Sequence, residues 1–184
     1  MQKIEKALLL VANLSQDKKI LDYRIEEILN LCDTSKVDIQ GIVVQNIKKP
    51  LRSYLGSGKL KESLQEAKLL KVDVIIVDDE LSPNQQKYLE DFFKIKIVDR
   101  TALILDIFAE RAKSKEGRLQ VSLAQMQFLL PRLAGQWSHL ERLGGGIGTR
   151  GPGETQIETD RRLVRNSIKK IKKDLLKVKT SRST

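Results

Sequence analysis

One short segment of the chain combines glycines with arginines and could contact phosphate groups. Seven of the eleven glycines lie between Gly135 and Gly153, and residues 144–162 read Gly-Gly-Gly-Ile-Gly-Thr-Arg-Gly-Pro-Gly-Glu-Thr-Gln-Ile-Glu-Thr-Asp-Arg-Arg. Glycine lets backbone N–H groups approach a ligand closely, and the planar guanidinium of arginine suits two-pronged contact with phosphate. Composition alone fits a flexible hairpin tip equally well. The candidate phosphate-contacting residues are Arg142, Gly144, Gly145, Gly146, Gly148, Arg150, Gly151, Gly153, Arg161, Arg162 and Arg165.

Two other glycine patterns resemble nucleotide-binding motifs but fail on spacing or context. In Gly56-Ser57-Gly58-Lys59, the phosphate-loop motif requires a further glycine where Ser53 stands, and Ser or Thr where Leu60 stands. The run 146–151 matches the dinucleotide fingerprint letter for letter, but that motif follows a strand and leads directly into a helix. Here Pro152-Gly153 follow instead. Neither pattern therefore predicts a nucleotide site, although the loop before Lys59 could touch RNA.

Acidic residues follow two of the predicted strands and could in principle bind a metal ion. Asp78, Asp79 and Asp99 stand at these positions, but no histidine joins them. Solvated loop carboxylates are the simpler interpretation. His139 is the only histidine and has no second ligand at a suitable spacing. We therefore predict no metal site and no catalytic residue in this chain.

Residues 1–100 are expected to form an α/β unit. Apolar runs predict four strands, at 6–11, 39–45, 72–77 and 95–98. Amphipathic stretches predict helices between them, at 22–31, 59–70 and from Ser82 onward, where Pro83 and Gln85 complete a capping-box pattern. Strands that alternate with helices indicate a small four-stranded parallel sheet with flanking helices.

Residues 101–184 follow a different, heptad-like pattern. The first apolar series is Leu105, Ala109, Ala112, Leu119, Leu123, Met126, Leu130 and Leu133, and the second is Ile157, Val164, Ile168, Ile171, Leu175 and Val178. The first series predicts one helix of about 30 residues from position 101, weakened at Gly117 and kinked or ended by Pro131. Thr155 and Glu158 predict a capping box for the second. Together they predict a long antiparallel, coiled-coil-like helical hairpin with a Gly-rich tip loop at 134–155.

The charge of the chain is concentrated in this second part. The net charge is +10; residues 1–100 hold 17 basic and 16 acidic side chains, and residues 101–184 hold 17 and 8. A basic part joined to a neutral part indicates contact with a polyanion. Aromatic residues make up only 4 % of the chain, which favours phosphate contact over base stacking. The lysines between 169 and 179 could instead be the solvated face of a coiled coil.

The remaining composition limits the class of protein. Cys32, the only cysteine, cannot form an internal disulfide and is expected to be a small buried residue at a helix end. No apolar run approaches the ~18 residues of a membrane span, and the residues after Met1 do not resemble a signal peptide. These features predict no membrane span and a cytoplasmic location.

Several motifs resemble those of the HflX family of ribosome-associated GTPases. The Gly-rich run 144–162 is the most specific of them. Further matches are Tyr54-Leu55-Gly56-Ser57-Gly58-Lys59, Asp78-Asp79-Glu80-Leu81-Ser82-Pro83, Val98-Asp99-Arg100-Thr101, Ile104-Leu105-Asp106-Ile107-Phe108-Ala109 and Leu129-Leu130-Pro131-Arg132-Leu133. The resemblance covers nearly the whole chain.

The resemblance implies a function and a domain plan. It implies that the chain is an N-terminal domain, made of an α/β subdomain (1–100) and a helical hairpin subdomain (101–184). It also implies a GTPase domain after residue 184, which this chain does not contain. The implied partners are the large ribosomal subunit, its rRNA and the GTPase domain, which the N-terminal domain would regulate during ribosome splitting or rescue. GTP and Mg²⁺ would belong to the full-length protein; no cofactor and no GTP hydrolysis are expected here.

Two alternatives use other features of the sequence. The α/β unit could be an autonomous nucleotide-binding domain that uses the ends of its strands, where parallel sheets bind ligands. The helical part could be a coiled coil for protein interaction. The lack of a nucleophile–base pair or a metal constellation weighs against the first alternative. The excess of positive charge in 101–184 weighs against the second.

Overall fold

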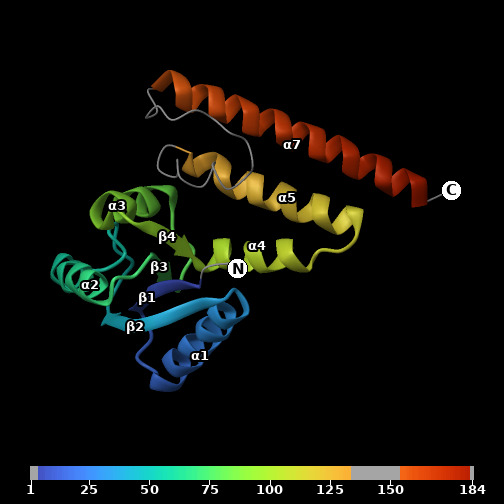
Figure 1. Ribbon diagram of the computed structural model, residues 1–184. Helices are drawn as coiled ribbons and strands as arrows, with labels where there is room; N and C mark the ends of the chain where they lie inside the picture. The colour runs from blue at the N-terminus through green and yellow to red at the C-terminus, as the bar shows by residue number, and fades with distance from the viewer. Residues whose placement is uncertain (1–3, 134–153, 183–184) are drawn as a thin grey trace. The chain divides into compact units, whose positions relative to one another are not determined.

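The computed structural model describes residues 4–133 and 154–182 of the chain (Figure 1). The chain divides into two compact units, Met1–Ile104 and Leu105–Thr184. The first unit contains β1 (Glu5–Asn13), α1 (Lys18–Thr34), β2 (Val37–Asn46), α2 (Ser57–Leu70), β3 (Val74–Val77), α3 (Pro83–Phe93), β4 (Lys96–Asp99) and the start of α4 (Arg100–Arg111). The rest of α4 belongs to the second unit, with α5 (Lys115–Leu129), the 3₁₀ helix η1 (Leu130–Arg132) and α7 (Glu154–Arg182).

The four strands form one parallel sheet in the order β2-β1-β3-β4, as the alternation of strands and helices predicts. A bulge between Ala7 and Leu8 shifts the register of β1 against β2. Because β2 and β3 pair with opposite sides of β1, the chain direction across the sheet reverses between β1 and β3. Ligands of open parallel sheets bind at such reversal points, beyond the carboxyl ends of the strands.

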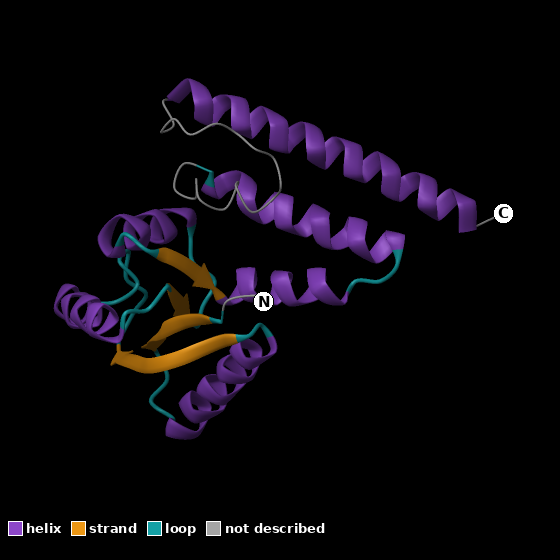
Figure 2. Cartoon of the chain, viewed as in Figure 1, coloured by secondary structure: helices purple, strands orange, loops and turns teal. Residues whose placement is uncertain are grey.

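Helices cover both faces of the sheet (Figure 2). On one face, Leu8 and Leu10 of β1 pack with buried residues of α2 and α3, such as Leu60 and Leu89. On the other face, the alternate residues of β1 pack with α1 and with the first turn of α4; the buried members of this cluster are Ala7, Leu9, Val11, Ile28, Cys32, Val74, Ile76, Val98 and Leu103. Strands buried on both faces explain why their sequences read as continuous apolar runs.

Local hydrogen bonds fix where the helices begin. The Ser82 hydroxyl accepts from the Gln85 N–H at 3.1 Å, and the Gln85 side-chain oxygen accepts from the Ser82 N–H at 3.0 Å, which confirms the predicted capping box. Asp17 caps α1 through the Lys19 N–H at 2.8 Å. This helix therefore starts earlier than its predicted first residue. Cys32 lies buried in the last turns of α1, as expected.

In the second unit, the predicted single helix from position 101 is wrong. The chain breaks between α4 and α5, where the Ser114 hydroxyl accepts from the Gly117 N–H at 2.9 Å and starts a new helix. Pro131 acts as predicted: α5 ends at Leu129 and a 3₁₀ turn follows. α7 begins at Glu154, so Thr155 lies inside the helix and is not its N-cap.

Helices α5 and α7 lie side by side in Figure 1 and share an apolar seam. Leu129, Leu133 and Val164 form its buried centre, with Met126, Leu130 and Ile168 packed around them. The half-buried positions of α7 continue along the predicted series to Val178. In α4 the series fails, because Ala109 is exposed. This pairing fits the predicted antiparallel hairpin, with α5 in place of the single long helix.

Within the described residues, none of the helices combines the length and apolar character that a bilayer crossing needs.

Candidate functional site

The first turns of α7 carry three of the predicted phosphate-contacting arginines. The side chains of Arg161 and Arg165 are 38 % and 56 % exposed, and Arg162 is exposed as well. The Glu158 carboxylate lies 3.8 Å from Arg161 Nη1 and 3.6 Å from Arg165 Nη1. Solvent screens such exposed pairs, and one carboxylate neutralises only one guanidinium. Over 154–165 three acidic residues balance the three arginines in formal charge, so the net positive charge of α7 comes from the lysines that follow.

The basic surface continues toward the end of α7. Residues three and four apart share one side of a helix, so Arg162, Arg165, Lys169 and Lys172 form a single exposed row, here called the α7 row. Across 161–179 there are nine basic residues and one acidic residue. The other exposed lysines of this stretch are Lys170, Lys173, Lys177 and Lys179. The seam with α5 uses a different side of α7, and the residues of the α7 row are exposed.

The other candidate residues lie outside the described part of the chain. These are Arg142, Gly144, Gly145, Gly146, Gly148, Arg150, Gly151 and Gly153. In sequence they immediately precede α7, whose first residue is Glu154.

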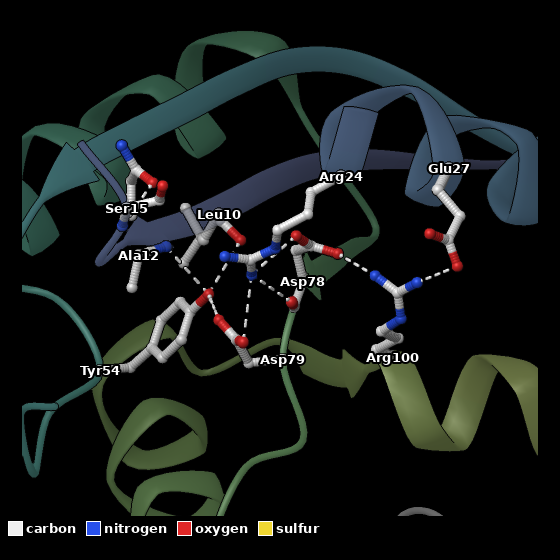
Figure 3. A network of polar contacts seen from close by, with 10 residues as sticks. Leu10, Ala12, Ser15, Arg24, Glu27, Tyr54, Asp78, Asp79 and Arg100 are labelled. Atoms are coloured by element: carbon white, nitrogen blue, oxygen red, sulfur yellow. Dashed lines mark hydrogen bonds and ion pairs between the residues drawn. The ribbon is translucent and has the colours of Figure 1, made fainter. Parts of the chain in front are cut away.

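A second polar cluster lies at the carboxyl ends of the strands, centred on Asp78 (Figure 3). The Asp78 carboxylate is fully buried and lies between two arginines: Arg24 Nη2 is 3.0 Å from its Oδ2, and Arg100 Nη1 donates to its Oδ1 at 2.9 Å. Arg24 also donates to the Asp78 carbonyl at 3.0 Å and to Asp79 Oδ1 at 3.1 Å. Arg100 completes its contacts with Glu27. The cluster thus joins α1, β3 and the start of α4.

Burial and charge act in opposite directions on these groups. Burial raises the pKa of the Asp78 carboxyl, while Arg24 and Arg100 lower it, and the net direction is upward. For Arg100, burial lowers the pKa, but the hydrogen bond to Glu27 and the charge of Asp78 outweigh it and the net direction is upward. Arg100 therefore keeps its positive charge, and this charge is directed at residues of the protein itself.

Tyr54 joins the cluster through hydrogen bonds to Asp79 and to β1. Its hydroxyl donates to Asp79 Oδ2 at 2.7 Å and accepts from the Ala12 N–H at 3.0 Å. Burial, followed by the negative charge of Asp79, raises the pKa of Tyr54 well above its usual range, so the phenol stays protonated. The backbone of Tyr54 has φ = 68°, a left-handed conformation that a bulky residue rarely adopts. The surrounding packing and these hydrogen bonds hold it there.

The interpretation of Asp78, Asp79 and Asp99 as solvated loop carboxylates is wrong for two of the three. Asp78 and Asp99 are each only 1 % exposed. Asp99 accepts from the Leu81 N–H and from the Ala102 N–H, both at 2.9 Å, so it caps the first turn of α4. Among the described residues, no three His, Cys, Asp or Glu side chains are grouped as a metal site would require. Within this part of the chain these carboxylates have a structural role.

This cluster occupies the place where a parallel sheet would bind a ligand. The reversal point lies between β1 and β3, and the Asp78 N–H donates to the Leu10 carbonyl there at 3.1 Å. Arg24 and Tyr54 cover the strand ends from α1 and from the loop before α2. The protein's own guanidinium and phenol groups thus fill the position that a phosphate or a base would need.

Sequence reasoning missed Arg24, Arg100 and Tyr54. One signal was available for Arg24, which stands between Leu21 and Ile28 on the apolar side of α1. A charged residue on a core-facing side requires a buried partner of opposite charge. The partner could not be identified from sequence, since Asp78 lies 54 positions away.

Comparisons with known proteins agree with this description. Family models described as GTP-binding GTPase N-terminal and GTP-binding GTPase Middle Region match residues 22–109 and 111–184. The chain is 50 % identical over 160 residues to the GTPase HflX of Caldanaerobacter subterraneus and 44 % identical over 179 residues to that of Escherichia coli K12. The chain belongs to the HflX family of GTPases. These alignments cover 86 % and 97 % of the chain, but only 37 % and 42 % of the two relatives.

Solved structures show the same fold. A crystal structure of a GTP-binding protein from Sulfolobus solfataricus in complex with GDP aligns with 96 % of this chain at a TM-score of 0.64 and 21 % identity. A structure of SsGBP with GDP aligns with 97 % of the chain at a TM-score of 0.70. In each case the chain covers less than half of the solved protein (46 % and 45 %). The chain therefore spans about two fifths of its HflX relatives and has the fold of the matching part.

Proposed function

We propose that this HflX-family chain binds the large ribosomal subunit through phosphates of its rRNA. The α7 row and the adjacent Gly-rich residues are the contact surface in this proposal. In the whole protein, GTP and Mg²⁺ belong to the GTPase domain. Ribosome binding by this portion then regulates GTP hydrolysis during ribosome splitting or rescue, in the cytoplasm.

The observation that carries the proposal is the exposed basic side of α7. Nine basic residues and one acidic residue fall within 161–179, and the arginines stand at the end of the helix nearest in sequence to the glycines. Polyanion binding of this kind depends on phosphate contacts and releases counterions. Such a surface on an HflX-family chain suits a partner rich in RNA, such as the ribosome.

Neither alternative finds equal support. At the reversal point of the sheet, the guanidinium groups that a nucleotide phosphate would need are already paired with Asp78 and Asp79, and the Tyr54 hydroxyl is bonded to Asp79. A coiled coil for protein interaction would present an apolar seam, but the α7 seam is already packed against α5. The exposed side is cationic, which favours an anionic partner.

The test compares two variants that lose the same charge from the same helix. The α7 arginine variant carries Arg161→Gln, Arg162→Gln and Arg165→Gln. The matched lysine variant carries Lys170→Gln, Lys173→Gln and Lys177→Gln, on the other flank of the exposed side. Glutamine keeps helix propensity and removes only charge. Both are titrated against purified large subunits over a range of salt concentrations.

The arginine variant is expected to bind more weakly and to flatten the log–log salt slope by about 2 to 3, roughly 0.7 to 0.9 per lost phosphate contact. The lysine variant should change the slope less, because its side chains lie farther along the chain from the Gly-rich residues. If both variants lose the same affinity for the large subunit, binding depends only on diffuse electrostatic attraction, and the arginines of α7 are not a specific contact.

A further inference from the structure

A groove at the carboxyl ends of β1 and β2 belongs to neither the Asp78 cluster nor α7. Its volume is about 830 Å³. Leu14, Leu21 and Ile47 supply its apolar surface. Its polar lining comes from Lys18 and Lys48 and from uncharged groups, namely Asn13, Ser15, Gln16 and Asn46. No carboxylate is among these lining residues.

The neighbouring pocket provides a contrast within the same unit. It measures about 190 Å³ and shares Leu14 and Ile47 with the groove as a common wall. Its charged lining residues are Asp79 and Glu80, with no lysine or arginine. The groove and the neighbouring pocket, both at the carboxyl ends of the strands, are therefore lined by opposite charges. Only the groove is suited to an anion.

The walls of the groove are held in place by hydrogen bonds. Asn13 Nδ2 donates to Asn46 Oδ1 at 2.8 Å, and the Ile47 N–H donates to the Asn13 carbonyl at 2.9 Å, which ties the ends of β1 and β2 together. The Ser15 N–H then donates to Asn13 Oδ1 at 3.2 Å. Lys18 starts α1 directly after this turn, so its position is set by a fixed loop.

The positive charge extends beyond the groove itself. The two segments that line the groove, 13–21 and 46–52, also contain Lys19, Lys49 and Arg52, and all five of their basic side chains are exposed. No ion pair among the described residues engages any of the five. Asp17 is the one acid of the two segments, and its carboxylate accepts from the Lys19 N–H. The rest of residues 1–100 holds twelve basic and fifteen acidic residues.

We propose that this groove binds phosphate groups of an RNA strand, as a second RNA contact separate from α7. This inference rests on the proposed function in one respect, the choice of RNA as the ligand. Phosphates of a free nucleotide have the same chemistry, but five cations across two segments exceed what one nucleotide needs and suit successive phosphates. The apolar surface of the groove accommodates the sugar and base between them.

The test uses the full 184-residue chain with two charge-matched double variants. The groove variant carries Lys18→Gln and Lys48→Gln. The control carries Lys61→Gln and Lys87→Gln, two exposed lysines of α2 and α3 outside the groove. Each pair is made in the unaltered chain and in the α7 arginine variant. Thermal unfolding followed by circular dichroism verifies that all four proteins fold.

The ligands are a short single-stranded RNA of mixed sequence and, separately, a nucleoside triphosphate. The groove variant is expected to flatten the log–log salt slope for RNA by about 1.4, roughly 0.7 for each lost single-strand contact. The control should retain most of the slope. The difference should persist in the α7 background, because the two surfaces contribute separately.

Each outcome decides between the two surfaces. If the groove and control variants lose RNA affinity equally, or if the unaltered chain does not bind RNA at low salt, the groove proposal is overturned. It is also overturned if the groove variant loses only triphosphate binding, because the ligand would then be a free nucleotide. If the groove variant weakens RNA binding while the α7 variant does not, the groove stands and the α7 proposal fails.

Discussion

At the scale of single residues, a few polar side chains decide what the strand ends can bind. Arg24 and Arg100 hold the buried Asp78 carboxylate, and Tyr54 holds Asp79. Removing one member of such a buried network leaves another without its partner, which destabilises more than the net value of the pair. These residues are therefore expected to act on stability, and the α7 row on binding.

Tyr54→Phe tests the stabilising role of the phenol. The change leaves the buried Ala12 N–H without its acceptor and Asp79 without one donor, so the free energy of unfolding should fall by about 1–3 kcal/mol. Urea unfolding followed by circular dichroism measures this. Tyr23→Phe, at a side chain that is 67 % exposed, is the matched control and should be close to neutral. Equal stability of the two variants would contradict the network.

Glu90 should make the stability of the chain depend on pH. Burial, with a smaller effect from Asp91, raises the pKa of Glu90 from 4.5 to about 7, against the opposing hydrogen bond from Gln86. The folded protein then binds more protons than the unfolded chain between about pH 4.5 and pH 7. The contribution of Glu90 to stability is therefore largest below this window and is lost as pH rises through it.

Glu90→Gln keeps the side chain neutral at every pH. The variant should be more stable than the unaltered chain at about pH 8, with little difference at about pH 5, in urea unfolding at both pH values. Glu26→Gln, at an exposed carboxylate of α1, is the control. A Glu90→Gln variant that is less stable at the higher pH would show that Glu90 functions as a carboxylate.

At the scale of elements, periodicity predicted most of the secondary structure. Strands read as apolar runs because helices cover both faces of the sheet, and the Ser82 cap was readable because its hydrogen bonds are local. The break at Ser114 was not predicted, since the apolar series continues past it. A serine cap three residues before Gly117 competes with helix continuation there, and glycine weakens the helix.

Long-range pairing explains the other misses. The contacts of Arg24 with Asp78 and of Tyr54 with Asp79 join residues far apart in sequence, and no local pattern encodes them. Asp99 was predicted to be a solvated carboxylate, but it is buried between the loop before α3, where it accepts from Leu81, and the first turn of α4, where it accepts from Ala102. Residue type and spacing alone placed Arg161, Arg162 and Arg165 on a helix, and their contact with phosphate stays a prediction.

Val164→Asp tests the seam between α5 and α7. Val164 is 4 % exposed and packs with Leu129 and Leu133, so an unpaired carboxylate there should separate the helices. Circular dichroism should show loss of helix while the α/β unit still unfolds cooperatively. Leu163→Asp, at a neighbouring side chain that is 46 % exposed, should leave helicity unchanged. If both variants keep full helicity, Val164 is not buried between α5 and α7 as described.

At the scale of the whole molecule, charge and contacts divide the chain into parts with different expected tasks. The first unit is nearly neutral as a whole, and the reversal point between β1 and β3 is occupied by its own side chains. The second part carries most of the net charge of +10. This division predicts a binding function without catalysis for the described residues.

The 184-residue chain should therefore not hydrolyse GTP. The loop that most resembles a phosphate loop is occupied: the Gly56 N–H donates to Gln45 Oε1 at 2.7 Å, and Lys59 pairs with Glu62 at 3.1 Å. Phosphate release from GTP should match the buffer rate for the unaltered chain and for Lys59→Ala. Steady turnover that Lys59→Ala abolishes would show that this loop is catalytic.

Cross-linking the chain to the large subunit from a defined position tests the proposed α7 contact most directly. A photoreactive amino acid at Asn166, an exposed position beside Arg162 and Arg165, should cross-link to rRNA. The same amino acid at Leu69, which is 83 % exposed, should not cross-link to rRNA. Leu69 lies in the last turn of α2, which leads to the amino end of β3, whereas the groove lies at the carboxyl ends of the strands. Cross-links to rRNA from position 69 and none from position 166 would contradict the account.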